Sequence, residues 1–200
     1  MTKIKLCGLS QLCDIEAVNE LNPDYIGFVF ASKSRRYVTY ERAAELKSRL
    51  SPEIQAVGVF VNESLQNVAK LLQKGVIDMA QLHGDEDEDY ITQLRQLTNK
   101  PIIQAFRIKT AKDVNTAQQS RADYILLDSG AGTGTVFDWE LVKSIRRSYF
   151  LAGGLDADNV TDAVKALHPF AVDVSSGIET GGVKDKSKMA AFAAAVRKED

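Results

Sequence analysis

The stretch Tyr124-Ile125-Leu126-Leu127-Asp128-Ser129-Gly130 decides the fold class, and Ile4-Lys5-Leu6-Cys7-Gly8 repeats its design near the start of the chain. Each is a short, mainly apolar run that ends in a reactive side chain, with glycine close behind. Runs without polar alternation are typical of a parallel sheet whose faces are both covered. We therefore expect Cys7 and Asp128 on one rim of such a sheet, where a thiol and a carboxyl can move protons without metal or cofactor.

Strand-like and helix-like segments alternate along the whole chain. We expect strands at 3–7, 25–30, 55–61, 77–82, 101–106, 124–127, 149–152 and 170–174. We expect helices at 11–21, 39–50, 64–74, 90–97, 112–119, 139–146, 159–167 and 188–197. Eight strand–helix pairs with no long linker favour an α/β fold, a single (β/α)8 TIM barrel over residues 1–200. An open doubly wound sheet is the alternative, and it does occur at this length.

Composition places the chain among globular proteins and limits its partners. Apolar residues make up 44% and charged residues 26% of 200 residues, enough for a substantial core. The net charge of −2 gives no reason to expect nucleic acid or an anionic membrane as a partner. A small anionic ligand would need a local binding site.

Cysteine usage and hydropathy suggest the compartment. No signal peptide and no membrane-length apolar run is visible, so we expect a cytoplasmic protein in which Cys7 and Cys13 are free thiols. His83 and His168 lie far apart in sequence, and we expect neither a metal centre nor a cofactor. No helix face carries an extra apolar stripe, which favours a monomer.

Two glycine-bearing turns predict a phosphate site. Ala152-Gly153-Gly154 follows the seventh expected strand, and Ser175-Ser176-Gly177 follows the eighth. Barrels commonly hold phosphate at this place, because glycine lets backbone N–H groups approach the anion closely. Tight turns with no ligand are the alternative. The segment Gly130–Thr135 fits neither common nucleotide-binding glycine motif and is either a lid over the site or a surface loop.

Other polar residues at the expected strand ends are weaker signals. Arg35-Arg36 follows the second strand, where a guanidinium could hold a carboxylate, although such a run is usually solvated. Cys7 could simply pack in the core. Asp128 needs a polar partner or a function, because it ends a Leu-Leu strand. His83 is expected as a wall of the pocket.

With these residues assembled, the chain resembles the phosphoribosylanthranilate isomerase family over nearly its whole length. The segments that carry the resemblance are Lys5-Leu6-Cys7-Gly8, Gly27-Phe28-Val29-Phe30, Ser34-Arg35-Arg36-Tyr37-Val38, Gln81-Leu82-His83-Gly84, Leu127-Asp128-Ser129, Gly132-Thr133-Gly134 with Phe137-Asp138-Trp139, Ala152-Gly153-Gly154-Leu155, and Asp173-Val174-Ser175-Ser176-Gly177-Ile178-Glu179. The resemblance implies a cofactor-free Amadori rearrangement in tryptophan biosynthesis, from an N-linked aminoaldose phosphate to an aminoketose phosphate.

The same resemblance implies roles for individual residues. Cys7 would be the general base that takes the proton from the second sugar carbon, and Asp128 the general acid that opens the sugar ring. Arg36, rather than Arg35, would hold the anthranilate carboxylate, and Asp173 would lie near the sugar hydroxyls. The phosphate would be bound by Gly153, Gly154, Ser176 and Gly177.

Two other functions compete with this interpretation. The related isomerase of histidine biosynthesis acts on a similar phosphoribosyl amine, but that family uses an aspartate where Cys7 stands. A phosphate-binding barrel without catalytic activity, acting as a sensor, would not need the acid, the base and the arginine together.

Overall fold

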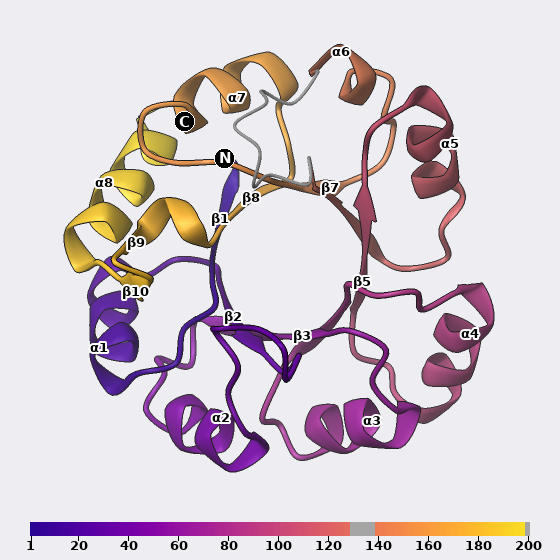
Figure 1. The fold of residues 1–200 in the computed structure, drawn as a ribbon, viewed down its shortest axis with the longest axis horizontal. Helices are drawn as coiled ribbons and strands as arrows, with labels where there is room; N and C mark the ends of the chain where they lie inside the picture. The colour runs from indigo at the N-terminus through magenta and orange to yellow at the C-terminus, as the bar shows by residue number, and fades with distance from the viewer. Residues whose placement is uncertain (129–138, 199–200) are drawn as a thin grey trace.

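A closed barrel of parallel strands forms the centre of the protein. The computed structural model describes residues 1–128 and 139–198. The barrel strands are β1 (Lys3–Cys7), β2 (Tyr25–Val29), β3 (Gln55–Phe60), β4 (Met79–Leu82), β5 (Ile102–Arg107), β6 (Tyr124–Asp128), β7 (Tyr149–Ala152) and β8 (Ala171–Val174). They pair in sequence order, and β8 pairs with β1 to close the ring (Figure 1). The prediction of a (β/α)8 barrel is therefore confirmed, and the open sheet is excluded.

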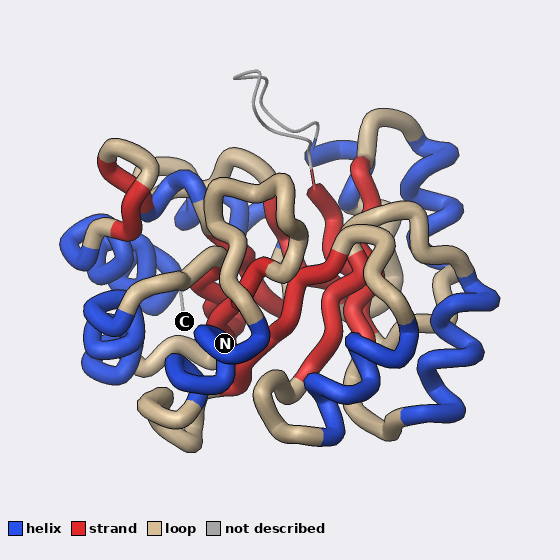
Figure 2. Tube along the Cα trace, turned by 60° about the horizontal axis from the view of Figure 1, so that its bottom comes forward, coloured by secondary structure: helices blue, strands red, loops and turns tan. Residues whose placement is uncertain are grey.

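Helices surround the barrel on its outside, as Figures 1 and 2 show. They are α1 (Leu12–Leu21), α2 (Tyr40–Lys47), α3 (Leu65–Gln73), α4 (Glu88–Leu97), α5 (Ala111–Gln119), α6 (Trp139–Val142), α7 (Val160–Leu167) and α8 (Lys186–Arg197). Several begin at side chains that cap the first turn: the hydroxyls of Thr39 and Ser64 accept from the backbone N–H groups of Arg42 and Asn67. Within the described residues, no helix is long and apolar enough to cross a membrane.

Alternation along each strand divides the side chains between two cores. Outward-facing residues such as Leu6 and Phe28 pack against the helices in the main hydrophobic cluster. Inward-facing residues, including Val57, Ile103 and Phe150, fill the barrel itself. Nearer the carboxyl ends of the strands, the interior layer becomes smaller and holds Cys7.

A group of aromatic rings fills the barrel interior near the amino ends of the strands. Tyr25 and Tyr124 both meet Phe150 edge-on, with ring centroids 5.4 and 5.8 Å apart. Phe170 stacks on Tyr124 at 4.9 Å. These contacts leave the carboxyl end of the barrel as the place where polar side chains gather.

Two regions differ most from the sequence prediction. The sixth helix ends at Val142 rather than at residue 146. The chain turns away there, and Arg147 donates hydrogen bonds to the backbone carbonyls of Ser120 and Ala122, at 2.6 and 2.5 Å. After β8 the chain forms a short 3-10 helix (Ser176–Ile178) and then a hairpin of β9 (Glu179–Thr180) and β10 (Val183–Lys184), which the sequence did not predict.

Candidate active site

A cavity of about 250 Å³ opens at the carboxyl ends of the barrel strands. Its lining includes eight of the nine residues that the sequence singled out: Cys7, Arg36, His83, Asp128, Gly153, Gly154, Asp173 and Ser176. Gly177, the ninth, is not in the lining. The barrel therefore brings together side chains from strands that are distant in sequence, at the position where barrels of this type carry their active sites.

Cys7 ends β1 and faces into the barrel beside Val29 and Val59. Gly27 on the neighbouring strand gives the thiol room, because a Cβ at that position would lie 2.5 Å from the Cys7 Sγ. Burial raises the pKa of the Cys7 thiol, and the positive charges of Lys5 and Lys184 only partly oppose this. In the free protein Cys7 is therefore held mainly as a thiol at neutral pH.

A buried ion pair lies below Cys7 in the barrel. Lys5, two residues before Cys7 on the same strand, is 0% exposed, and its Nζ lies 2.9 Å from Asp173 Oδ1 on β8. Burial alone would lower the pKa of Lys5, but the negative charge of Asp173 and its hydrogen bond outweigh burial, and the pKa is raised. Sequence reasoning gave Lys5 no role, although a lysine inside an otherwise apolar strand was the signal that could have found it.

Asp128 lies across the barrel from Cys7, at the end of β6, and is close to an imidazole. His83 Nε2 lies 3.5 Å from Asp128 Oδ2, and His83 Nδ1 lies 2.9 Å from Gln81 Nε2. The Gln81 side chain is buried, and its Oε1 has no hydrogen-bond partner among the described residues. A carboxyl, an imidazole and an amide thus form a polar wall that can exchange protons and hydrogen bonds with a ligand.

Arg36 reaches into the cavity from the loop after β2, whereas Arg35 is exposed and does not line it. The glycine at position 8 allows this approach, because a Cβ there would lie 2.5 Å from Arg36 Cδ. The guanidinium is bound side-on by Glu179, with Nε to Oε1 at 2.5 Å and Nη2 to Oε2 at 2.9 Å. Hydrogen bonds with Glu179 raise the pKa of Arg36, so its positive charge is permanent.

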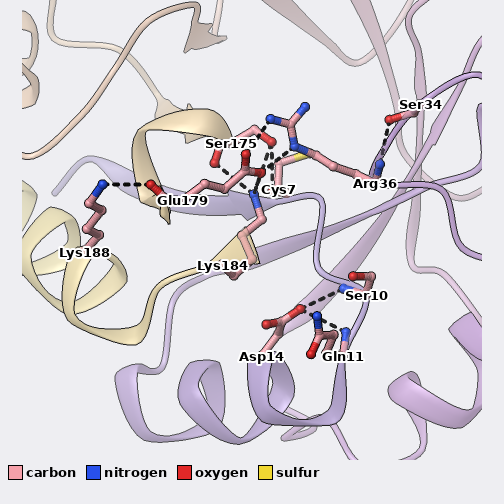
Figure 3. Close-up of polar contacts among 10 residues, drawn as sticks. All are labelled: Cys7, Ser10, Gln11, Asp14, Ser34, Arg36, Ser175, Glu179, Lys184 and Lys188. Atoms are coloured by element: carbon pink, nitrogen blue, oxygen red, sulfur yellow. Dashed lines mark hydrogen bonds and ion pairs between the residues drawn. The ribbon is translucent and has the colours of Figure 1, made fainter. Parts of the chain in front are cut away.

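The hairpin after β8 brings two residues that the sequence prediction missed. Lys184, whose side chain is 4% exposed, lies 2.8 Å from Glu179 and 2.8 Å from the carbonyl oxygen of Ser175. Ser175 Oγ in turn donates to the carbonyl oxygen of Cys7 at 3.1 Å. Figure 3 shows these side chains gathered beside Cys7 and Arg36. Glu179 stood in the segments that carry the resemblance, but nothing in the sequence pointed to its partners.

Glycine turns close the remaining side of the cavity. Gly153 and Gly154, after β7, adopt positive φ values of 93° and 66°, which side chains with a Cβ rarely adopt. Gly177 makes a close approach instead, because a Cβ there would lie 2.0 Å from the backbone oxygen of Leu155. The two turns thus pack backbone against backbone at the cavity, and glycine turns of this kind can offer backbone N–H groups to an anion.

Some expectations fall on residues that are not described. The Gly130–Thr135 segment, expected as a lid or a surface loop, lies outside residues 1–128 and 139–198, as do Ser129, Phe137 and Asp138 of the segments that carry the resemblance. In those described ranges, no group of three or more His, Cys, Asp or Glu side chains is placed to hold a metal ion.

The fold and the cavity together define a class of protein, the (β/α)8-barrel enzymes with acid, base and anion-binding groups at the carboxyl ends of the strands. Comparison with known proteins gives the particular family. The model of the N-(5'-phosphoribosyl)anthranilate (PRA) isomerase family matches residues 4–195. An N-(5'-phosphoribosyl)anthranilate isomerase of Endomicrobium trichonymphae is 45% identical, over 94% of this chain and 95% of the relative.

Solved structures agree with the family model. The crystal structure of phosphoribosyl anthranilate isomerase from Thermotoga maritima has a TM-score of 0.92 at 34% identity and covers 99% of this chain and 100% of its own. A structure of such an isomerase in complex with reduced 1-(o-carboxyphenylamino)-1-deoxyribulose 5-phosphate has a TM-score of 0.89 at 33% identity, with 99% and 100% coverage. The chain belongs to the N-(5'-phosphoribosyl)anthranilate isomerase family.

Proposed function

We propose that the protein converts N-(5-phosphoribosyl)anthranilate to 1-(2-carboxyphenylamino)-1-deoxyribulose 5-phosphate in tryptophan biosynthesis. The observation that carries this is the convergence of Cys7 and Asp128, from β1 and β6, on one cavity between Arg36 and the glycine turns. A solved member of the family carries the reduced form of this product, which has a carboxylate at one end and a phosphate at the other. The cavity offers a cation and a backbone site for those two groups.

The chemistry needs one acid and one base, acting in turn. Asp128 donates a proton to the ring oxygen of the furanose while the bond from that oxygen to C1 breaks. The lone pair of the anthranilate nitrogen completes an iminium with C1. The Cys7 thiolate then removes the proton from C2, and the electron pair of that bond moves towards the iminium nitrogen to form an enolamine. The enolamine becomes the ketose when C1 takes up a proton and the C2 hydroxyl loses one, and proton exchange with solvent returns Cys7 to the thiolate and Asp128 to the acid. No electrons are gained or lost overall.

Other residues supply binding. Arg36 takes the carboxylate of the substrate, and Gly153, Gly154, Ser176 and Gly177 hold its phosphate with backbone N–H groups. His83 lies beside Asp128 and forms part of the wall against the sugar. Asp173, already paired with Lys5, accepts hydrogen bonds from sugar hydroxyls.

The working unit that we propose is a monomer with one catalytic domain over residues 1–200, because one chain contributes every group named above. Its compartment is the cytoplasm, where the thiols of Cys7 and Cys13 stay reduced. Light scattering of the purified protein tests the monomer, since a molecular mass near twice that of one chain contradicts it.

The test is consumption of phosphoribosylanthranilate, followed by its fluorescence, with purified protein and no added metal or nucleotide. Cys7→Ser is expected to lower kcat by a factor on the order of a thousand, because a hydroxyl is a far weaker base than a thiolate. Asp128→Asn is expected to lower kcat to a similar extent, because an amide cannot supply the proton. Both variants should keep the wild-type circular dichroism spectrum. Rates like that of the wild type would remove the substituted residue from the mechanism.

A further inference from the structure

We propose that Glu179 is a positioning residue, which holds the Arg36 guanidinium by one edge so that its free end meets the carboxylate of the substrate. This inference rests on the proposed function and assigns the origin of its specificity for an aminobenzoate over an uncharged arylamine. Glu179 lies on the hairpin after β8 and Arg36 on the loop after β2, so the two are separated by 143 residues in sequence.

The bond pattern shows which donors remain available. Glu179 occupies the edge formed by Nε and Nη2, at 2.5 and 2.9 Å. One N–H of Nη1 and the second N–H of Nη2 point from the end of the guanidinium, and the other N–H of Nη1 points towards the side of Cδ. In the described part of the chain none of these three has an acceptor. That end is a second fork of the geometry that carboxylates bind.

Glu179 also forms an ion pair with Lys184, so Arg36 is not the sole cation that balances its charge. Lys184 Nζ lies 2.8 Å from Glu179 Oε1, and both side chains are nearly buried, at 4% and 7% exposed. Lys188 donates to the backbone oxygen of Glu179 at 2.7 Å. Burial would raise the pKa of Glu179, but hydrogen bonds from Arg36 and Lys184 lower it instead, so the carboxylate stays charged. The bridge is therefore a fixed part of the hairpin.

Charge balance explains why the bridge between Arg36 and Glu179 does not remove the positive charge that binds a carboxylate. Arg36 and Lys184 are positive and Glu179 is negative, so the three together carry one net positive charge. An arriving carboxylate neutralises that charge without displacing Glu179. In the alternative, Glu179 competes with the substrate carboxylate for Arg36 and must be displaced. That alternative predicts that removing the charge of Glu179 strengthens binding of the carboxylated ligand.

The experiment measures the dissociation constant of reduced 1-(o-carboxyphenylamino)-1-deoxyribulose 5-phosphate by calorimetry. The same compound made with aniline, which lacks the carboxylate, serves as the second ligand. Glu179→Gln keeps the size of the side chain and removes its charge. We expect it to weaken binding of the carboxylated ligand about tenfold and to change binding of the analogue without the carboxylate by less than about twofold. KM should rise by the same factor, with kcat nearly unchanged.

Thr180→Ala is the matched control. Thr180 Oγ1 bonds to Asp185 in the same hairpin at 2.7 Å and does not touch the guanidinium. Thr180→Ala should leave the affinity for both ligands unchanged. An equal loss of affinity for both ligands in Glu179→Gln would show that the substitution only loosened the hairpin, and would overturn the inference. Tighter binding of the carboxylated ligand by Glu179→Gln would make Glu179 a competitor and overturn the inference. If the wild-type protein neither binds the carboxylated ligand nor consumes phosphoribosylanthranilate, the proposed function itself fails, whatever the result with Glu179→Gln.

Discussion

At the scale of single residues, the chemistry of the site is decided by competition around the Cys7 thiol. Desolvation inside the barrel favours the neutral thiol, and the carboxylate of Asp173 acts in the same direction. Lys5 below it and Lys184 beside it favour the thiolate, but burial is the larger effect. Only the thiolate form of Cys7 can take the proton from C2, so the reacting form is the minor one in the free protein, and it meets a C2 proton that the iminium has already made more acidic.

The pKa of Cys7 can be measured by alkylation in a Cys13→Ser background, which removes the exposed second thiol. We expect the rate of reaction with iodoacetamide to rise with pH and to reach its midpoint above the ordinary thiol value of 9.0. Lys5→Met should move this midpoint further upward, because it removes a positive charge that stabilises the thiolate. A midpoint below 9.0 would contradict the balance described here.

At the scale of elements, the loops after β7 and β8 depend on each other. The loop after β8 can lie against the loop after β7 because position 177 has no side chain. A Cβ there would lie 2.0 Å from the oxygen of Leu155 and 3.1 Å from the Cα of Asp156, both too close for ordinary contact. The same two loops provide the residues proposed to bind phosphate. Loop packing and anion binding should therefore be lost together.

Gly177→Ala tests this dependence. Its Cβ would lie 2.0 Å from the Leu155 oxygen, so the loops must separate. We expect the affinity for the reduced product to fall at least about tenfold and stability to fall by roughly 1–3 kcal/mol. Gly75→Asn is the control for backbone strain without a clash. Gly75 has φ 69°, which strains a side chain, but no atom lies within 4 Å of the added Cβ, so the ligand affinity should not change. Unchanged ligand affinity in Gly177→Ala would separate loop packing from binding.

The hairpin and the sixth helix show where sequence patterns stop being informative. Strands of four to six mainly apolar residues carry enough pattern to be recognised, and all eight barrel strands were predicted within two residues of their observed bounds. A strand of two residues, such as Glu179–Thr180, carries no periodicity at all. The partners of Lys5, Arg36 and Lys184 were equally invisible, because each pairing depends on which strands and loops become neighbours when the barrel closes.

At the scale of the whole molecule, the barrel is closed at the junction of its first and last strands. Lys5 and Asp173 are opposite each other in the register of β1 and β8, so their ion pair spans this junction. A buried pair of this kind adds little over an apolar pair, but leaving one partner alone is costly. The pKa of Lys5 is raised, so its contribution is complete at neutral pH and is lost only as pH rises through that raised value.

Lys5→Met should lower the free energy of unfolding by about 3 kcal/mol or more at neutral pH, because Asp173 is left buried without its cation. Urea denaturation followed by circular dichroism measures this. Lys47→Met breaks the half-exposed pair between Lys47 and Asp78 and should cost less than about 1 kcal/mol. Equal losses in the two variants would show that burial of the Lys5 pair is unimportant.

The aromatic rings of Tyr25, Tyr124, Phe150 and Phe170 have a consequence for how substrate enters and product leaves. They fill the barrel at the end away from the cavity, which opens at the carboxyl ends of the strands. Substrate and product therefore occupy the same cavity in turn. Accumulated product should inhibit in competition with substrate, with an inhibition constant equal to the dissociation constant of the product.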